Sequence, residues 1–167
     1  LKHNETLIAY RSKESIPSDV IVYGGDFIQV SQLWHIFEYN DDCIQSDFKL
    51  LTEGRTSQLI SETNACTKPE NIFIEEGAKV EHTILNASTG PIYVGKDAEI
   101  MEGSIVRGPL AMCENSVLKM GAKIYGATTL GPYCKVGGEV NNSVLLGYSN
   151  KGPVSYTHLT LPTIITV

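Results

Sequence analysis

The most regular feature of the chain is an apolar position that recurs every six residues across its second half. The row runs without a break through Val94, Ile100, Val106, Met112, Leu118, Ile124, Leu130 and Val136. Four residues after each member comes a second row, mostly of small residues: Ala98, Ser104, Leu110, Ser116, Ala122, Thr128, Cys134 and Val140. A helix needs apolar spacing of three and four and a solitary strand needs spacing of two, so neither explains a period of six. A short period held over many units is typical of a solenoid.

The two rows together predict a mainly β fold, a left-handed parallel β-helix of hexapeptide repeats. Each hexapeptide would form one flat side of a prism, with its aliphatic residue in the core and its small residue near the bend. One coil cannot bury its own apolar row, so successive coils must stack and cover one another.

The repeat is less regular at both edges. Ile74 and Val80 are also six apart, but the next position falls on Asn86, and residues 86–91 indicate an inserted turn. After Val136 the period falls on Asn142 and then on Tyr148, although residues 144–146 still have the composition of a strand. We assign residues 72–152 to the β-helix and expect its regular coils to run to about Tyr148.

Residues 1–54 do not share the period. Residues 6–10 and 20–23 are rich in β-branched and aromatic side chains and predict two short strands. Two strands without a partner sheet are not stable alone, so we interpret residues 1–54 as the C-terminal remnant of a larger α/β domain.

A connector helix is predicted at the end of this remnant, with Asn40 as its N-cap and Gly54 at its end. Its first turn carries two acids that the helix dipole favours, Asp41 and Asp42. One face carries three apolar residues: Ile44, Phe48 and Leu51. Three further residues are expected to pack the helix against its neighbours: Trp34, Ile36 and Phe37. Residues 55–71 are a polar linker.

Composition narrows the class of protein. The chain has 167 residues and 42% hydrophobic content, which fits one domain with a small attachment. A net charge of -6 argues against a nucleic-acid partner, which needs a basic surface. No apolar run approaches the roughly 20 residues of a membrane span, and no signal peptide opens the chain, so a cytoplasmic location is expected. Four scattered cysteines have no metal-ligand spacing, so no metal site is expected.

Residues 153–167 break every pattern. The run from Ser155 to Ile164 is similar to translated sequencing-adapter DNA, so we expect a non-native tail. The alternative is a genuine short β-rich terminus.

Several runs carry a resemblance to a known family. They are WHIF (34–37), LTEGR (51–55), GPIYVG (90–95), MEGSIVRGP (101–109), KMGAKIYG (119–126), KVGGEVNNS (135–143) and GYSNKG (147–152). Over residues 1–152 the chain resembles bacterial sugar nucleotidyltransferases fused to a hexapeptide-repeat acyltransferase. It is similar to the bifunctional N-acetylglucosamine-1-phosphate uridylyltransferase / glucosamine-1-phosphate acetyltransferases.

The resemblance implies two activities. The N-terminal domain would join a sugar 1-phosphate to a nucleotide with Mg²⁺, and the β-helix would move an acetyl group from acetyl-CoA to an amino sugar. It also implies a homotrimer with the acetyl site between subunits. Residues 1–54 contain neither a Gly-rich nucleotide loop nor a placed carboxylate pair, so no complete active site is expected in the chain.

Candidate substrate-binding residues follow from the same resemblance. Arg107 stands where the family carries an Arg beside a Pro and Gly, and a guanidinium fork matches phosphate geometry. The alternative is an exposed, solvent-facing charge. The other candidates are Lys119, Asn141, Asn142 and Lys151, with Lys123 a weaker one. Inward asparagines stacked between coils are the alternative for the Asn pair, and Tyr125 and Tyr148 are expected in packing or interfaces.

The catalytic base stays unknown. Acetyl transfer calls for a group with pKa near the working pH, usually His. In the related acetyltransferases it follows a turn like Lys151-Gly152, but Pro153 stands there, and His158 lies in the adapter-like tail. Two functions stay open: a fragment of a nucleotide-sugar transferase, or a non-catalytic β-helix that trimerises or presents a sugar-binding or regulatory surface.

Overall fold

The computed structural model describes residues 2–3, 6–7, 22, 24–25 and 28–153, and divides the chain into two units, residues 1–31 and 32–167. In the first unit, strands β1 (Lys2–His3) and β2 (Thr6–Leu7) pair antiparallel. Strand β2 lies within the first predicted strand, residues 6–10, of which residues 8–10 are outside the described part. Of the second predicted strand, residues 20–23, only Val22 is described.

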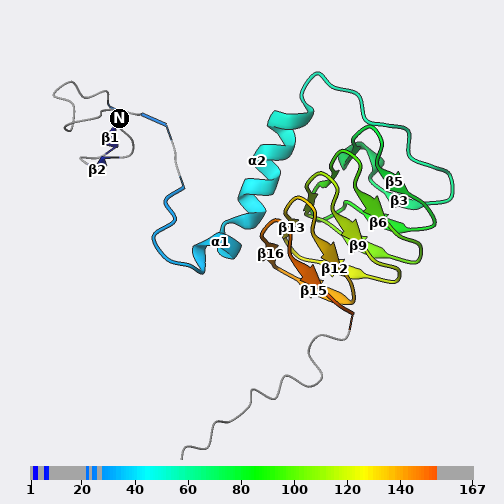
Figure 1. Cartoon of the computed structure of the whole chain (residues 1–167). Coiled ribbons are helices and arrows are strands. Elements are labelled where there is room, and N and C mark those ends of the chain that lie inside the picture. The colour runs from blue at the N-terminus through cyan, green and yellow to red at the C-terminus, as the bar shows by residue number, and fades with distance from the viewer. Residues whose placement is uncertain (1, 4–5, 8–21, 23, 26–27, 154–167) are drawn as a thin grey trace, which may run out of the picture. The chain divides into compact units, whose positions relative to one another are not determined.

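The second unit contains a parallel β-solenoid of about five turns (Figure 1). Its first sheet consists of β4 (Ile72–Ile74), β7 (Ile92–Val94), β10 (Leu110–Met112), β13 (Thr128–Leu130) and β16 (Val144–Leu145). Its second sheet consists of β5 (Lys79–Val80), β8 (Glu99–Ile100), β11 (Val117–Leu118), β14 (Lys135–Val136) and β17 (Asn150–Lys151). Its third sheet consists of β3 (Ala65–Thr67), β6 (Ile84–Asn86), β9 (Ile105–Arg107), β12 (Lys123–Tyr125) and β15 (Glu139–Asn141). Every pairing inside these sheets is parallel, as the hexapeptide pattern predicts.

The aliphatic row forms the core of the solenoid. All eight members of the predicted row, from Val94 to Val136, are at most 1% exposed. They stack in register, so that Met112 lies between Val94 and Leu130. The small row is also buried through Cys134. Each coil therefore covers the apolar interior of the next, which is the energetic reason for the repeat.

The coils differ in length, and this corrects the predicted phase at both edges. The core position that the period places at Asn86 is occupied by Leu85, which is fully buried. Leu85 pairs with Val106, so the coil between them is longer than the regular coils. At the other edge, Val140 pairs with Ile124, only sixteen residues earlier, because the turn after β14 is two residues shorter. The assignment of Val140 to the small row is therefore wrong, because Val140 occupies the core position that the period places at Asn142. The solenoid continues beyond Tyr148 to β17, where Lys151 pairs with Val136.

Two helices precede the solenoid within the second unit: α1 (His35–Glu38) and α2 (Asn40–Thr52). A short 3-10 turn, Pro69–Asn71, follows β3, which itself lies in the segment expected as a linker. Helix α2 lies beside the first sheet (Figure 1), where Ile44 is buried. Its C-terminal end is followed by Gly54 in the left-handed region, as predicted.

The predicted N-cap role of Asn40 is wrong. Tyr39 precedes the first helical residue, and the helix has no side-chain cap. Asn40 is buried instead, at 6% exposure, and its amide joins the helix to the solenoid. Its Nδ2 donates to the Ala127 carbonyl at 2.9 Å, and Thr129 Oγ1 donates to its Oδ1 at 2.7 Å. A tertiary contact therefore replaces the local cap.

The other end of α2 is attached through Arg55. Its guanidinium donates to the Leu51 carbonyl at 2.9 Å and to Glu75 at 2.7 Å, and lies 5.2 Å from the Phe73 ring centre. Tyr93 donates to the same Glu75 carboxylate at 2.6 Å. These contacts connect the helix end to the first coils.

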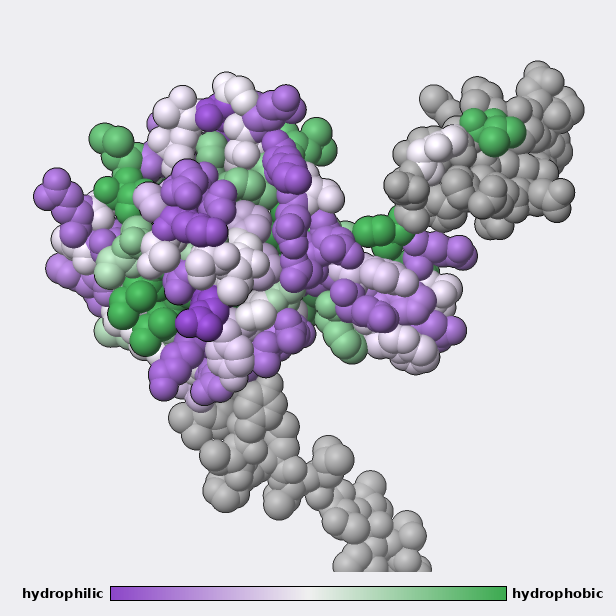
Figure 2. Space-filling model, turned by 180° about the vertical axis from the view of Figure 1, so that it is seen from behind, coloured by the Kyte–Doolittle hydropathy of each residue, from purple (hydrophilic) through white to green (hydrophobic). Residues whose placement is uncertain are grey.

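The apolar side chains near α1 do not pack as predicted. Trp34, Ile36 and Phe37 are 54%, 44% and 52% exposed, so within the described chain each is covered only in part. The face of the solenoid opposite that in Figure 1 is largely hydrophilic, with a few separate hydrophobic groups (Figure 2). None of the helices in the described ranges is long and apolar enough to cross a membrane.

Candidate functional site

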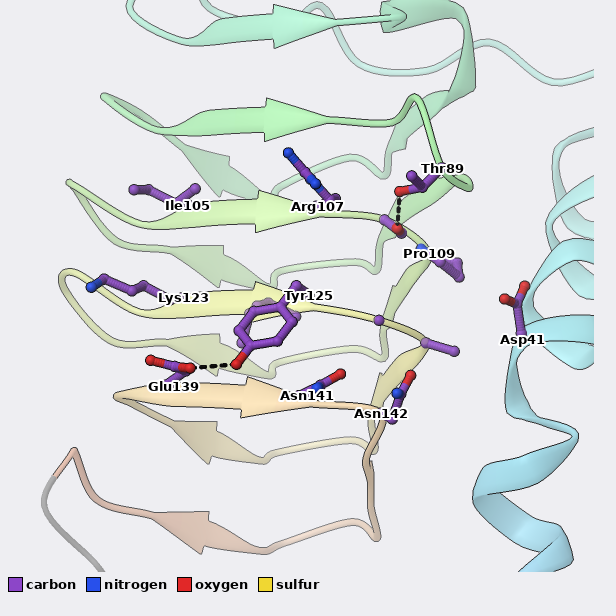
Figure 3. A pocket seen from close by; sticks show the side chains of 14 residues that line it. Asp41, Thr89, Ile105, Arg107, Pro109, Lys123, Tyr125, Glu139, Asn141 and Asn142 are labelled. Atoms are coloured by element: carbon purple, nitrogen blue, oxygen red, sulfur yellow. Dashed lines mark hydrogen bonds between the residues drawn. The ribbon is translucent and has the colours of Figure 1, made fainter.

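A groove of about 720 Å³ lies on the outer face of the third sheet and extends to helix α2 (Figure 3). Its lining includes Asp41, Thr89, Ile105, Arg107, Gly108, Pro109, Lys123, Ile124, Tyr125, Gly126, Ala127, Glu139, Asn141 and Asn142. The groove is therefore built from β9, β12 and β15, the corners that follow them, and the first turn of the helix.

The register of the third sheet explains which side chains meet. The middle residue of each strand points into the core, so its two neighbours point outward. One outward column contains Ile105, Lys123 and Glu139. Two residues further along the strands, a second column contains Arg107, Tyr125 and Asn141 (Figure 3). Neighbouring coils are roughly 4.8 Å apart, so each column places its side chains within reach of one ligand.

The groove contains two available cations. Within the described residues, neither the Arg107 guanidinium nor the Lys123 ammonium makes a hydrogen bond or ion pair. The neighbouring carboxylate, Glu139, accepts a hydrogen bond from Tyr125 Oη instead. That hydrogen bond raises the pKa of Tyr125 above its ordinary value. Glu139 is therefore engaged by the phenol, and the two cations have no anionic partner among the described residues.

Two amides line the corner after β12. A Cβ built on Gly126 would lie 2.5 Å from Asn141 Oδ1, and closer still to the amide oxygen of Asn142. Gly126 also has φ of +70°, a conformation that side chains disfavour. The absence of a side chain at Gly126 therefore allows both amides to extend across the corner into the groove.

The end of the groove near the helix has a different character. Asp41, in the first turn of α2, faces it across from Pro109 and Asn142 (Figure 3). Thr89 Oγ1 donates to the Gly108 carbonyl at 2.5 Å and fixes the corner beneath. The groove thus has two cations and the Tyr125-bound Glu139 carboxylate on the sheet, and a second carboxylate at the helix.

The structure brings together three of the five predicted substrate-binding residues: Arg107, Asn141 and Asn142. The other two belong to the second sheet: Lys119 directly follows β11, and Lys151 is in β17. Lys119 Nζ donates to Asn150 Oδ1 at 3.4 Å, and Lys151 Nζ donates to the Gly137 carbonyl at 2.9 Å. Their role in binding stays a prediction.

Sequence reasoning missed Asp41 and Glu139 as groove residues and took Tyr125 for a packing residue. The place of Tyr125 beside Arg107 could have been inferred from the period, because Tyr125 stands eighteen residues after Arg107. The places of Glu139 and Asn141 could not be inferred from the period, because they depend on the shortened turn after β14. Asp41 reaches the groove only through the packing of α2, for which no sequence signal exists.

The fold and the groove together define the class of protein: a hexapeptide-repeat parallel β-helix with an outward, mixed-charge groove beside a connector helix. Residues 1–56 further match the model of a family described as sugar nucleotidyl transferase. This region includes both α1 and α2. No curated protein and no solved structure matches the chain. The match supports the sugar nucleotidyltransferase part of the resemblance.

Proposed function

We propose that the chain is part of a nucleotide-sugar transferase. Residues 1–54 would come from a sugar-1-phosphate nucleotidyltransferase domain, and the β-helix would bind an amino-sugar phosphate for acetylation by acetyl-CoA. The family match of residues 1–56 supports the first half of this proposal. The observation that carries the second half is the Arg107 guanidinium, which has no partner among the described residues and faces a groove.

The chemistry of the groove suits a sugar phosphate. A guanidinium offers a planar fork of donors that matches two phosphate oxygens, and Lys123 adds a second positive charge. Asn141 and Asn142 each offer a donor and an acceptor, which suits the hydroxyl groups of a sugar. The groove volume of about 720 Å³ falls within the range of small-molecule sites.

The described residues do not fit the two cofactors that the resemblance implies. Mg²⁺ is usually held by one or two carboxylates together with substrate phosphates, and no group of three His, Cys, Asp or Glu that could hold a metal ion by itself gathers anywhere in the described ranges. Acetyl transfer from acetyl-CoA needs a base, and the groove lining contains no His. We therefore derive no step through either group, and expect the chain to bind a sugar phosphate without acetylating it.

We propose a homotrimer formed through the β-helix. Ile84 and Ile105 are neighbours in register on the third sheet, and both point outward with 49% and 43% exposure. Covering this apolar pair with another subunit would place the groove beside the interface. Size-exclusion chromatography with light scattering should give three times the 18.2 kDa chain mass. A single monomer peak would refute the trimer.

The binding proposal is tested by isothermal titration of glucosamine 1-phosphate. Arg107→Gln removes the charge and the fork, and a hydrogen bond to a charged group is worth about 1.5–3 kcal/mol, so we expect about a 10- to 150-fold loss of affinity. Lys135→Gln is the matched control, because it removes an exposed cation outside the groove. An affinity that is equal in wild type and Arg107→Gln would refute the phosphate site.

A second function is favoured by the lack of a His in the groove. In this alternative the β-helix is a non-catalytic module that trimerises and binds a sugar in a regulatory role. Release of CoA thiol, measured in the same chain with acetyl-CoA and glucosamine 1-phosphate, tests this alternative. Turnover that depends on Arg107 would refute the non-catalytic module, whereas binding without turnover is expected both of the module and of an acetyltransferase fragment that lacks its base.

A further inference from the structure

The end of the groove beside the helix contains a negative charge that the proposed phosphate site does not use. Asp41 lines this end, whereas the cations Arg107 and Lys123 belong to the sheet (Figure 3). Asp42, the next residue, occupies the same helical turn but is exposed and does not line the groove. The helix dipole accounts equally for both acids, so it does not explain why one of them faces the groove.

The position of Asp41 is fixed by its neighbours. Asn40 immediately before it is held by hydrogen bonds to Ala127 and Thr129, at 2.9 and 2.7 Å. Gln45 Nε2, one turn along the helix, donates to Asp41 Oδ1 at 2.5 Å. Within the described chain the second carboxylate oxygen has no hydrogen-bond partner. Such support of a side chain by its surroundings is what a precise binding contact requires.

We propose that Asp41 is a specificity-determining residue of the groove. When a ligand phosphate is held at Arg107, Asp41 accepts a hydrogen bond from a hydroxyl or ammonium group at the far end of the ligand. The same charge rejects a ligand that carries a second anionic group there. This inference rests on the proposed sugar-phosphate site. It adds the orientation of the ligand in that site and the charge of the group at the end of the ligand away from the phosphate.

The selectivity that we expect from Asp41 follows from the charge distribution along the groove. An ionised carboxylate only accepts hydrogen bonds, and it binds a cationic donor more strongly than a neutral one. The other carboxylate in the groove, Glu139, lies on β15 and is engaged by Tyr125, so it does not supply this contact at the helix. Rejection of the wrong charge is a common source of specificity. The helix thereby selects ligands that the sheet alone would bind without discrimination.

The test compares three probes by isothermal titration on the full chain: 6-amino-6-deoxyglucose 1-phosphate, glucose 1-phosphate and glucose 1,6-bisphosphate. Their far ends are cationic, neutral and anionic. We expect wild type to bind them in that order of affinity. Asp41→Asn keeps the shape of the side chain and removes its charge. The affinity ratio between the first and third probes should then fall about two- to fivefold for each charge–charge interaction with Asp41 that is lost, the range for partly screened charges. Asp42→Asn, the matched control, should leave the ratios unchanged.

The outcomes separate this inference from the proposed function. A compressed ratio in Asp41→Asn alone supports the inference. Unchanged ratios in Asp41→Asn, with binding still lost in Arg107→Gln, overturn it and leave the phosphate site standing. An equal change in Asp42→Asn overturns it as well, because the effect would then come from the general field of the helix. Failure of wild type to bind any probe refutes both proposals.

Discussion

Replacing Asn40 by alanine should release helix α2 from the solenoid without unfolding the coils. The substitution removes two hydrogen bonds of a buried amide, one to the Ala127 carbonyl and one from the Thr129 hydroxyl. Each bond contributes about 0.5–1.5 kcal/mol, so the docked helix should lose about 1–3 kcal/mol. Alanine is the better helix former, so any loss comes from docking and not from helix propensity.

Native-state hydrogen exchange of the α2 backbone amides measures this effect directly. A loss of about 1–3 kcal/mol raises the population of the open helix by about 5- to 150-fold, and the exchange rates should rise by the same factor. Amides of β10 and β11 in the middle of the solenoid should keep their protection. Ser46→Ala, an exposed change on the same helix, is the control and should not speed exchange. Unchanged α2 exchange in Asn40→Ala would refute the anchoring role.

Three further predictions concern the core, the groove and pH. Leu118→Ala creates a cavity at a fully buried position and should cost about 2–5 kcal/mol of unfolding free energy in urea titrations; a cost below 1 kcal/mol would contradict tight coil stacking. Gly126→Ala should displace the amide of Asn141 and weaken sugar-phosphate binding in titration calorimetry, and equal affinity would refute the role of this corner. Burial, together with the hydrogen bond to Glu75, raises the pKa of Tyr93 to about 12, so its contribution to stability is complete below pH 10 and is lost as pH rises towards 12. Tyr93→Phe should flatten this alkaline loss in denaturation series, and a curve parallel to wild type would contradict the assignment.

The fold could be predicted from the sequence where the period is strict. Between Val94 and Val136 each core position follows from the one before, because every coil must present the same residue to the stack. The prediction failed where a turn changes length. Val140 is apolar and fits either row, and only pairing with Ile124 decides its place. A turn shortened around glycines leaves no periodic signal to mark the change.

The candidate site was predictable to the extent that it depends on single strands. Arg107 stood out because it stands where the resembled family carries an Arg beside a Pro and Gly, and because a guanidinium suits a phosphate. Asp41 did not, because its contact with the groove follows from Asn40, whose side chain bonds to residues 87 and 89 positions away. Local capping rules assigned that amide to its own helix. Long-range packing overrode the local preference here, and a single sequence does not reveal such a choice.

The attachment of α2 at both ends has a mechanical consequence for the stack of coils. Asn40 fixes one end of the helix to the coil of β13, and Arg55 fixes the other to Glu75 beside β4. A helix of 13 residues is about 20 Å long, which exceeds the roughly 14 Å that separates those strands. The helix therefore acts as a splint parallel to the solenoid axis. A linear array unfolds by fraying from its ends, because each repeat contacts only its neighbours. The splint couples coils that do not touch, and so opposes independent fraying of the coils between β4 and β13.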